Sequence, residues 1–271
     1  MIGGSPFAGL PPTSALRLVL KKISHAYRDL TVLDEISLDI PPGEVTVLVG
    51  PSGCGKSTLL GILGGLLAPT RGEVLCEGAV ATDCLNPLTY VFQDFALLPW
   101  RTVAGNVSLV LEGRLPREAR RARIEEVLRI AGLTEFARAW PRQLSGGMRQ
   151  RVGIARALAV RPACLLMDEP LSALDAQTRA LLLDEFAGLI ERAGTTTVYV
   201  THNLAEAVRL GHQIVVLSRR PGRVRHIARI ERPIAGRAAT DPDLLAIEAE
   251  LWRMIRDDAA AADREGADAA A

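Results

Sequence analysis

Residues 50–58 read Gly50-Pro51-Ser52-Gly53-Cys54-Gly55-Lys56-Ser57-Thr58, and this stretch decides the fold of the chain. It satisfies the phosphate-loop pattern G-x-x-x-x-G-K-[ST] at every specified position. A nucleotide triphosphate carries several negative charges in a small volume, so its loop needs converging backbone N–H donors with few side chains in the way. The glycines at positions 50, 53 and 55 meet this need. The stretch therefore predicts a nucleotide site.

The sequence on both sides of the loop fits this interpretation. Residues 44–49 are an apolar, β-branched run that is typical of a buried parallel strand. Leu59, Ile62, Leu63 and Leu66 follow the loop at helical spacing. In this arrangement we expect Lys56 to reach the β- and γ-phosphates, and Ser57, at the start of the helix, to ligate Mg²⁺. The alternative is a chance glycine turn, which this context disfavours.

Composition indicates a globular chain with one large domain, or a domain with an insert. The 271 residues include 32 basic and 31 acidic side chains, for a net charge of +1, and 4% are aromatic. Neither value favours nucleic acid as a partner. No apolar run approaches the ~20 residues that span a bilayer, and no signal segment opens the chain, so we expect a cytoplasmic protein. The cysteines at 54, 76, 84 and 164 form no C-x-x-C pair and predict reduced thiols.

Both ends of the chain are expected to be irregular. Residues 1–15 are rich in Gly and Pro and predict a flexible leader, while the Ala- and Asp-rich residues 257–271 predict a disordered tail. Strands are expected over 16–23 and 32–40, with Tyr27 in the loop between them. An aromatic side chain ahead of a phosphate loop can stack on adenine, and a tyrosine packed in the core is an equal alternative.

The segment after the first helix contains a polar strand end and an apolar patch. Residues 71–80 predict a short strand, and residues 89–92 predict a strand that ends at Gln93, where parallel sheets place ligand contacts. The patch is Phe95-Ala96-Leu97-Leu98-Pro99-Trp100. It is either a loop folded onto the core or a docking surface.

Two helices without a strand of their own follow. The first is expected over 116–131, with Ile124, Val127, Leu128 and Ala131 on one face. Its five arginines predict a solvated face. The second is expected over 145–160, with Met148, Val152, Ala155 and Ala159 on one side. This arrangement predicts a helical insert in an α/β domain.

Two acidic residues end the next apolar run. Residues 163–167 predict a buried strand that brings Asp168 and Glu169 to the carboxyl edge of the sheet. Asp168 can hold Mg²⁺ and Glu169 can accept a proton from an attacking water, although a structural pair is the alternative. A further strand over 195–201 ends at His202, beside the expected γ-phosphate. A later strand is expected over 213–217, basic and apolar residues alternate over 223–230, and a helix is expected over 244–255.

The run Leu144-Ser145-Gly146-Gly147-Met148-Arg149-Gln150-Arg151 resembles the signature sequence of ATP-binding cassette (ABC) ATPases. Such a string has a physical reason, because Ser145 caps a helix while Gly146 and Gly147 expose backbone N–H groups that bind phosphate. One chain does not easily bring this element and its own phosphate loop to one nucleotide. The resemblance implies a head-to-tail dimer, in which the signature of one copy closes over ATP held by the other.

The resemblance runs from about residue 16 to residue 255, and the family's motifs occur in order. It implies ATP and Mg²⁺ as cofactors and one α/β domain over 16–256. That domain has a RecA-like phosphate-loop core, an antiparallel β subdomain and a helical insert over about 95–160 that carries the signature. The implied roles are Tyr27 as the adenine-stacking aromatic, residues 50–58 as the Walker A loop, Gln93 as the lid glutamine that senses Mg²⁺ and the transport partner, Asp168 and Glu169 as the Walker B acids, residues 172–175 as the D-loop, and His202 as the switch histidine.

The function implied by the resemblance is that of the ATP-hydrolysing subunit of an importer. It would sit at the cytoplasmic face of the membrane on separate permease subunits, served indirectly by an extracytoplasmic solute-binding protein. An exporter subunit is the strongest alternative. DNA-repair relatives place a long coiled coil between Walker A and the signature, where this chain has fewer than a hundred residues. A phosphate-loop kinase or GTPase lacks the signature and the D-loop.

The sequence after Gln93 is similar to the branch of ABC ATPases that serves nitrate, taurine and aliphatic sulfonate import. The similar stretches are residues 92–94, 96–103 and 217–223 and the pair Leu251-Trp252. The chain departs from that branch at Gly211-His212-Gln213, where Ala-Asp-Arg is usual, and at Leu171, where Phe is usual. The resemblance implies a small organic or inorganic anion as the substrate.

Overall fold

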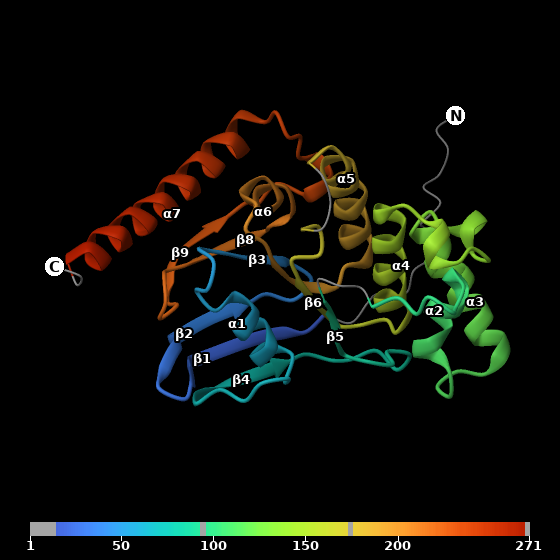
Figure 1. Cartoon of the computed structure of the whole chain (residues 1–271). Helices are drawn as coiled ribbons and strands as arrows, with labels where there is room; N and C mark the ends of the chain where they lie inside the picture. Colours follow the sequence, from blue (N-terminus) through green and yellow to red (C-terminus); the bar gives the residue numbers. More distant parts are fainter. Residues whose placement is uncertain (1–14, 93–95, 173–175, 269–271) are drawn as a thin grey trace.

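The computed structural model describes residues 15–92, 96–172 and 176–268, whose strands form two sheets (Figure 1). The smaller sheet is antiparallel and has the order β2-β1-β4, formed by β1 (Arg17–Tyr27), β2 (Leu30–Ile40) and β4 (Arg71–Glu77). The larger sheet has the order β5-β6-β7-β3-β8-β9, formed by β3 (Val45–Val49), β5 (Leu88–Val91), β6 (Cys164–Asp168), β7 (Thr196–Val200), β8 (Gln213–Leu217) and β9 (Val224–Arg229). Its strands are parallel except β9.

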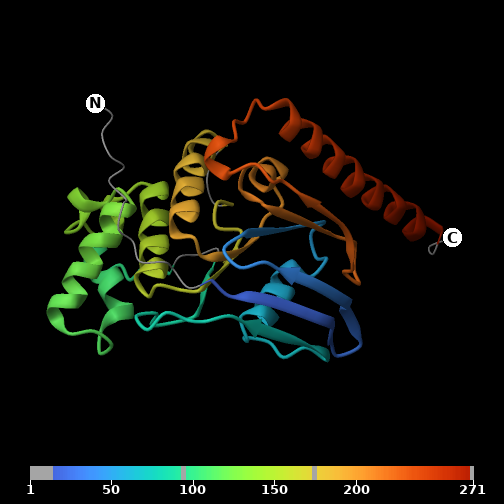
Figure 2. The ribbon, with the colours of Figure 1, turned by 180° about the vertical axis from the view of Figure 1, so that it is seen from behind.

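Helices cover both faces of the larger sheet and form a separate insert beside it (Figures 1 and 2). The α-helices are α1 (Lys56–Leu63), α2 (Val103–Ser108), α3 (Arg117–Ile130), α4 (Gly146–Ala159), α5 (Ala176–Ala193), α6 (Leu204–Leu210) and α7 (Pro242–Asp268). Short 3-10 helices are η1 (Leu109–Leu111), η2 (Thr134–Phe136), η3 (Pro141–Gln143) and η4 (Ile234–Gly236).

Three apolar clusters hold these layers together. One face of the larger sheet packs on α5, α6 and α7, and the other packs on α1 and the antiparallel sheet. The insert has its own core, formed by α2, α3 and α4 around Val107, Leu128 and Val152. Helix α4 also contributes Ile154 and Ala157 to the core of the larger sheet, so the insert lies beside that sheet and packs against it (Figure 2). The α/β class with an antiparallel subdomain and a helical insert is thus confirmed.

Strand β3 lies between β7 and β8, near the middle of the larger sheet, and all five of its residues are buried. Such a strand needs apolar side chains on both faces, which explains the continuous run in its sequence. The phosphate loop leaves β3 at its carboxyl end. The acids at the end of β6 and the histidine after β7 reach the same edge of the sheet.

Several sequence predictions differ from the structure in detail. Tyr27 is the last residue of β1, paired with Leu30, and not a loop residue. Leu66 lies beyond the end of α1 and is 58% exposed, because the helix ends at Leu63. Arg123 does not join the solvated face of α3, since it donates to the Ala159 carbonyl and its side chain is 10% exposed.

The chain ends bear on the predicted domain limits. Residues 1–14 of the expected leader lie outside the described part of the chain. Helix α7 continues to Asp268, so most of the segment expected to be a disordered tail is helical here. The division into leader, domain and tail stays a prediction.

Candidate nucleotide site

Two glycines of the phosphate loop lie where a side chain would clash with neighbouring atoms of the protein. Gly55 has φ 102°, and a Cβ on it would lie 2.6 Å from Leu33 Cδ2. Gly50 has φ 155°, and a Cβ there would lie 2.7 Å from the Leu217 carbonyl oxygen. Gly53, with φ 76°, faces open space, and a Cβ on it would meet no atom within 4 Å. Packing therefore requires glycine at positions 50 and 55, whereas the space beside Gly53 is open.

Lys56 begins α1 and is buried inside the loop that precedes it. Its Nζ donates to the Gly50 carbonyl at 2.8 Å and the Pro51 carbonyl at 3.0 Å. The N-cap of α1 is Gly55, which offers no side-chain cap to the first-turn N–H groups. A buried ammonium beside an uncapped helix N-terminus is suited to an anion. The loop thus fits a polyphosphate in both charge and available donors.

Ser57 and Asp168 meet although they lie 111 residues apart. Ser57 Oγ donates to Asp168 Oδ1 at 3.0 Å, and Tyr90 donates its hydroxyl hydrogen to Asp168 Oδ2 at 3.3 Å. Burial raises the pKa of Asp168, although the two hydrogen bonds oppose that shift. Such a rise favours the protonated acid, and a nearby divalent cation would reverse it.

This pair fits Mg²⁺ better than a metal that needs several side chains. Among the residues that the structure describes, no group of three or more His, Cys, Asp or Glu could hold a metal. Mg²⁺ takes one or two protein oxygens and completes its shell with water and substrate phosphates. One carboxylate and one hydroxyl beside a phosphate loop meet that requirement. Gln93, the third expected ligand, lies outside the described residues.

Glu169 and His202 come together at the ends of the neighbouring strands β6 and β7. His202 Nδ1 and Glu169 Oε2 lie 3.0 Å apart, and the Glu169 side chain is 26% exposed. Glu169 has φ 44°, a strained conformation for a non-glycine residue, and its N–H donates to the Val200 carbonyl at 3.0 Å. A partly exposed carboxylate held by a histidine at this edge can face a water beside the loop.

The signature is a second, separate helix N-terminus. Ser145 Oγ accepts from the Met148 N–H at 3.2 Å, as expected of a cap. Ser145 is exposed, while Gly147 is buried at the start of α4. Within the described parts of the chain, no hydrogen bond or ion pair joins residues 145–147 to residues 50–58. The structure does not bring the two predicted phosphate elements together.

Tyr27 is available for stacking, because its side chain is 47% exposed and does not pack in the core. One of its neighbours is His25, whose ring lies 4.7 Å away at 81°, an edge-on contact. Of the two alternatives open from the sequence, the exposed position disfavours the core tyrosine. Its role toward adenine stays a prediction.

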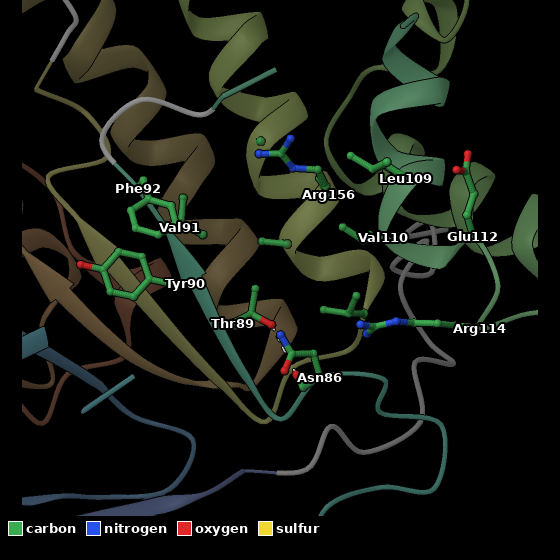
Figure 3. Close-up of a pocket in the computed structure, with 13 residues that line it drawn as sticks. Asn86, Thr89, Tyr90, Val91, Phe92, Leu109, Val110, Glu112, Arg114 and Arg156 are labelled. Carbon is green, nitrogen blue, oxygen red and sulfur yellow. Dashed lines mark hydrogen bonds between the residues drawn. The ribbon is translucent and has the colours of Figure 1, made fainter. Parts of the chain in front are cut away.

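A cavity of 430 Å³ opens beside β5, where the larger sheet meets the insert (Figure 3). Phe92, Leu109 and Val110 give it an apolar wall, and Glu112, Arg114 and Arg156 add charged groups. Arg156 donates to the Ala96 carbonyl at 3.1 Å, which ties the cavity to the segment after Gln93. Sequence reasoning missed these lining residues, since they come from three separate elements.

The expected apolar patch over 95–100 flanks this cavity but does not line it in the described residues 96–100. Trp100 is 69% exposed. The buried Asn106 holds the segment in place, because it accepts from the Leu98 N–H at 2.7 Å and donates to the Leu98, Arg101 and Thr102 carbonyls. Residues 96–100 are therefore held in place, with Leu97 packed against the insert core and Trp100 exposed, while Phe95 lies outside the described residues.

Comparison with known proteins gives the family. The model of the family described as ABC transporter matches residues 33–172. The chain belongs to this family. As a member of it, the chain is an ABC ATPase that binds and hydrolyses ATP. The residues that the structure describes include no helix long and apolar enough to cross a membrane.

Relatives of the ABC ATPase are similar over most of its length. The taurine import ATP-binding protein TauB of Rhizobium johnstonii is 44% identical over 84% of this chain and 89% of its own. The aliphatic sulfonates import ATP-binding protein SsuB of Ralstonia nicotianae is 46% identical over 78% and 73%. The nitrate import ATP-binding protein NrtC of Synechococcus elongatus is 45% identical over 70% of this chain and 29% of its own.

Solved structures agree with the fold. A dimeric post-hydrolysis state of the ATP-binding cassette MJ0796, bound to ADP and Pi, is 36% identical, with a TM-score of 0.65 over 79% of this chain and 99% of that chain. The ABC transporter component cbiO1 from Clostridium perfringens is 26% identical, with a TM-score of 0.70 over 78% and 88%.

Proposed function

We propose that this ABC ATPase powers an importer for a small anion, with taurine, aliphatic sulfonates or nitrate as the substrate class. The observation that carries the ATPase part is the meeting of Ser57 with Asp168 and of Glu169 with His202 at one sheet edge. The import part rests on relatives whose names give taurine, sulfonate and nitrate import.

Each group at the sheet edge has a distinct proposed role. Lys56 and the loop N–H groups bind the β- and γ-phosphates, and Tyr27 stacks on adenine. Ser57 and Asp168, with Gln93, hold Mg²⁺, which when bound neutralises charge on the phosphates. Glu169 accepts the proton of the attacking water. His202 holds the Glu169 carboxylate through the 3.0 Å contact and faces the γ-phosphate.

The working unit in this proposal is a head-to-tail dimer of two copies. Among the described residues, no hydrogen bond joins the signature N-terminus at Ser145, Gly146 and Gly147 to the phosphate loop of its own chain, which leaves the signature available to another copy. The solved MJ0796 cassettes are dimeric, which supports the same arrangement here. Each nucleotide would then lie between the loop of one copy and the signature of the other.

The cavity beside β5 is the proposed docking groove for a cytoplasmic helix of the permease. Its apolar wall at Phe92, Leu109 and Val110 suits an amphipathic helix, and its charged groups suit a polar rim. The cavity lies next to the strand that leads to Gln93, so partner docking and phosphate sensing would share one segment. The chain would sit at the cytoplasmic face of the membrane, and a solute-binding protein would act on the other side.

The residues that depart from the nitrate and sulfonate branch have structural roles in this chain. Gly211 leaves no space for a Cβ, which would lie 2.8 Å from the Ala207 carbonyl oxygen. His212 Nδ1 accepts from the Val45 N–H at 3.0 Å, and Gln213 donates to the Asp39 carbonyl at 2.9 Å. Leu171 is buried. The residues at these departures therefore pack and hydrogen-bond within the domain.

The experiment that tests the proposal is deletion of the gene, followed by growth and uptake with taurine, alkanesulfonates or nitrate as the sole sulfur or nitrogen source. We expect loss of growth on at least one of them and rescue by the wild-type gene. Unchanged growth and uptake on all of them would remove the substrate claim and leave the ATPase assignment intact.

A variant in the cavity separates coupling from hydrolysis in the same assay. Leu109→Glu places a charge in the apolar wall, so it should fail to rescue growth while the purified subunit hydrolyses ATP at a near-normal rate. Loss of both activities would instead indicate that Leu109 maintains the fold of the insert.

A further inference from the structure

Glu206 is a buried carboxylate that the proposed chemistry does not use. It lies in the first turn of α6, is 4% exposed, and its N–H donates to Asn203 Oδ1 at 3.2 Å. Glu206 Oε2 accepts hydrogen bonds from Tyr199 and Thr201, each at 2.8 Å. Burying a carboxylate is costly unless it is paired and hydrogen-bonded, so this cluster needs an explanation.

One oxygen of Glu206 holds the segment that carries His202. Thr201 Oγ1 donates to Glu206 Oε2 and also accepts from the Asn203 N–H at 3.0 Å. Thr201 is thus bonded directly to this carboxylate oxygen, and Asn203 is linked to it through the Thr201 hydroxyl. His202 itself is 56% exposed on its side chain, so these bonds to its neighbours fix its backbone.

The other oxygen of Glu206 faces the segment that follows Glu169. Arg179 on α5 lies with its Nε 3.8 Å from Glu206 Oε1, and its Nη2 donates to the Ser172 carbonyl at 3.5 Å. Ser172 in turn donates to the Glu169 carbonyl, through Oγ at 2.8 Å and through N–H at 3.1 Å. A continuous polar chain therefore runs from the backbone of Glu169 to that of His202.

We infer that Glu206, paired with Arg179, is a positioning residue that sets the distance between Glu169 and His202. The inference rests on the proposed roles of those two residues. Oε2 bonds Thr201, the residue before His202, and Oε1 faces Arg179, which bonds the segment after Glu169. One carboxylate therefore positions both residues. Glu206 does not itself contact the phosphate loop in the described structure, so it acts on hydrolysis and not on nucleotide binding.

The test is Glu206→Gln, which keeps an oxygen acceptor for Tyr199 and Thr201 but removes the charge that faces Arg179. Small displacements of reacting groups cost large factors in rate, so we expect kcat to fall about tenfold or more. KM for ATP, binding of a fluorescent ATP analogue and the melting temperature should stay near wild type. Glu250→Gln, an exposed change of the same kind on α7, is the control.

Arg179→Gln tests the other half of the pair and serves as the main variant where Glu206→Gln does not fold. The double variant should be no slower than the slower single variant, since both changes break one chain, and Arg179→Lys should recover part of kcat. Normal kcat in both single variants would overturn the inference, as would equal losses of nucleotide binding and thermal stability. Glu169→Gln, measured in parallel, shows separately whether the role of Glu169 holds.

Discussion

The chain carries two helix N-termini that we propose to face phosphate, and they differ in what surrounds them. At α1 the cap is Gly55, Lys56 is buried within the loop, and Asp168 reaches across from β6. At α4 the cap is the exposed Ser145, which already satisfies the Met148 N–H. The first has a cation, a helix N-terminus without a side-chain cap and the acid proposed to bind Mg²⁺ within one chain. The second offers donors at a surface, which is what half of a shared site requires.

The largest effect is expected at the α1 site, from removing Glu169, the residue that we propose as the general base. Glu169→Gln keeps the shape of the side chain at φ 44° and its hydrogen-bonding capacity, but the amide cannot accept the proton of the water. Loss of a general base costs ~10² to 10⁴ in rate, so we expect kcat to fall by that factor while ATP binding persists. Steady-state turnover and equilibrium binding measure the two effects. Near-normal turnover would refute the assignment of Glu169.

Mixing two inactive variants tests whether the two N-termini serve one nucleotide. Lys56→Ala disables the loop and Ser145→Arg blocks the signature, so each homodimer should be inactive. A mixed dimer has one intact site, and random pairing at equal concentrations should restore roughly a quarter of wild-type turnover. Light scattering in the presence of ATP reports the oligomeric state. Strong hydrolysis by a protein that remains monomeric would contradict a shared site.

The smallest expected effect comes from removing the side chain that caps α4 at the signature. Ser145→Ala removes the cap on the Met148 N–H, and loss of a cap costs about 1 kcal/mol of stability. For a chain of this size that corresponds to a fall of roughly 2–4 °C in Tm. Ser145→Asp keeps an acceptor for the cap and should restore Tm. It should nevertheless lower ATPase activity, because a carboxylate repels the phosphate; full activity in Ser145→Asp would argue against phosphate contact there.

Much of the fold was predictable because its signals are local. The run of β3, the face of α3 that includes Val127 and Leu128, and the cap at Ser145 follow from spacing along the chain. Errors arose where a partner far along the chain decides the outcome. The helical pattern predicts Arg123 at the surface, but its side chain is mostly buried because it donates to the Ala159 carbonyl and pairs with Asp83. Tyr27 is a different case, because it extends β1 by pairing with Leu30, which follows only three residues later across a tight turn.

The sequence by itself determined the phosphate loop, the signature and the acids at the end of β6, because glycine spacing, capping and strand endings act within a few residues. Only the tertiary structure decided that Ser57 lies 3.0 Å from Asp168 and that His202 lies 3.0 Å from Glu169. It also decided that Glu206 accepts hydrogen bonds from Tyr199 and Thr201. The physical reason is the strand order β6-β7-β3, which places three separate chain segments at one sheet edge. Local propensities carry no information on that order, because it depends on how whole elements pack.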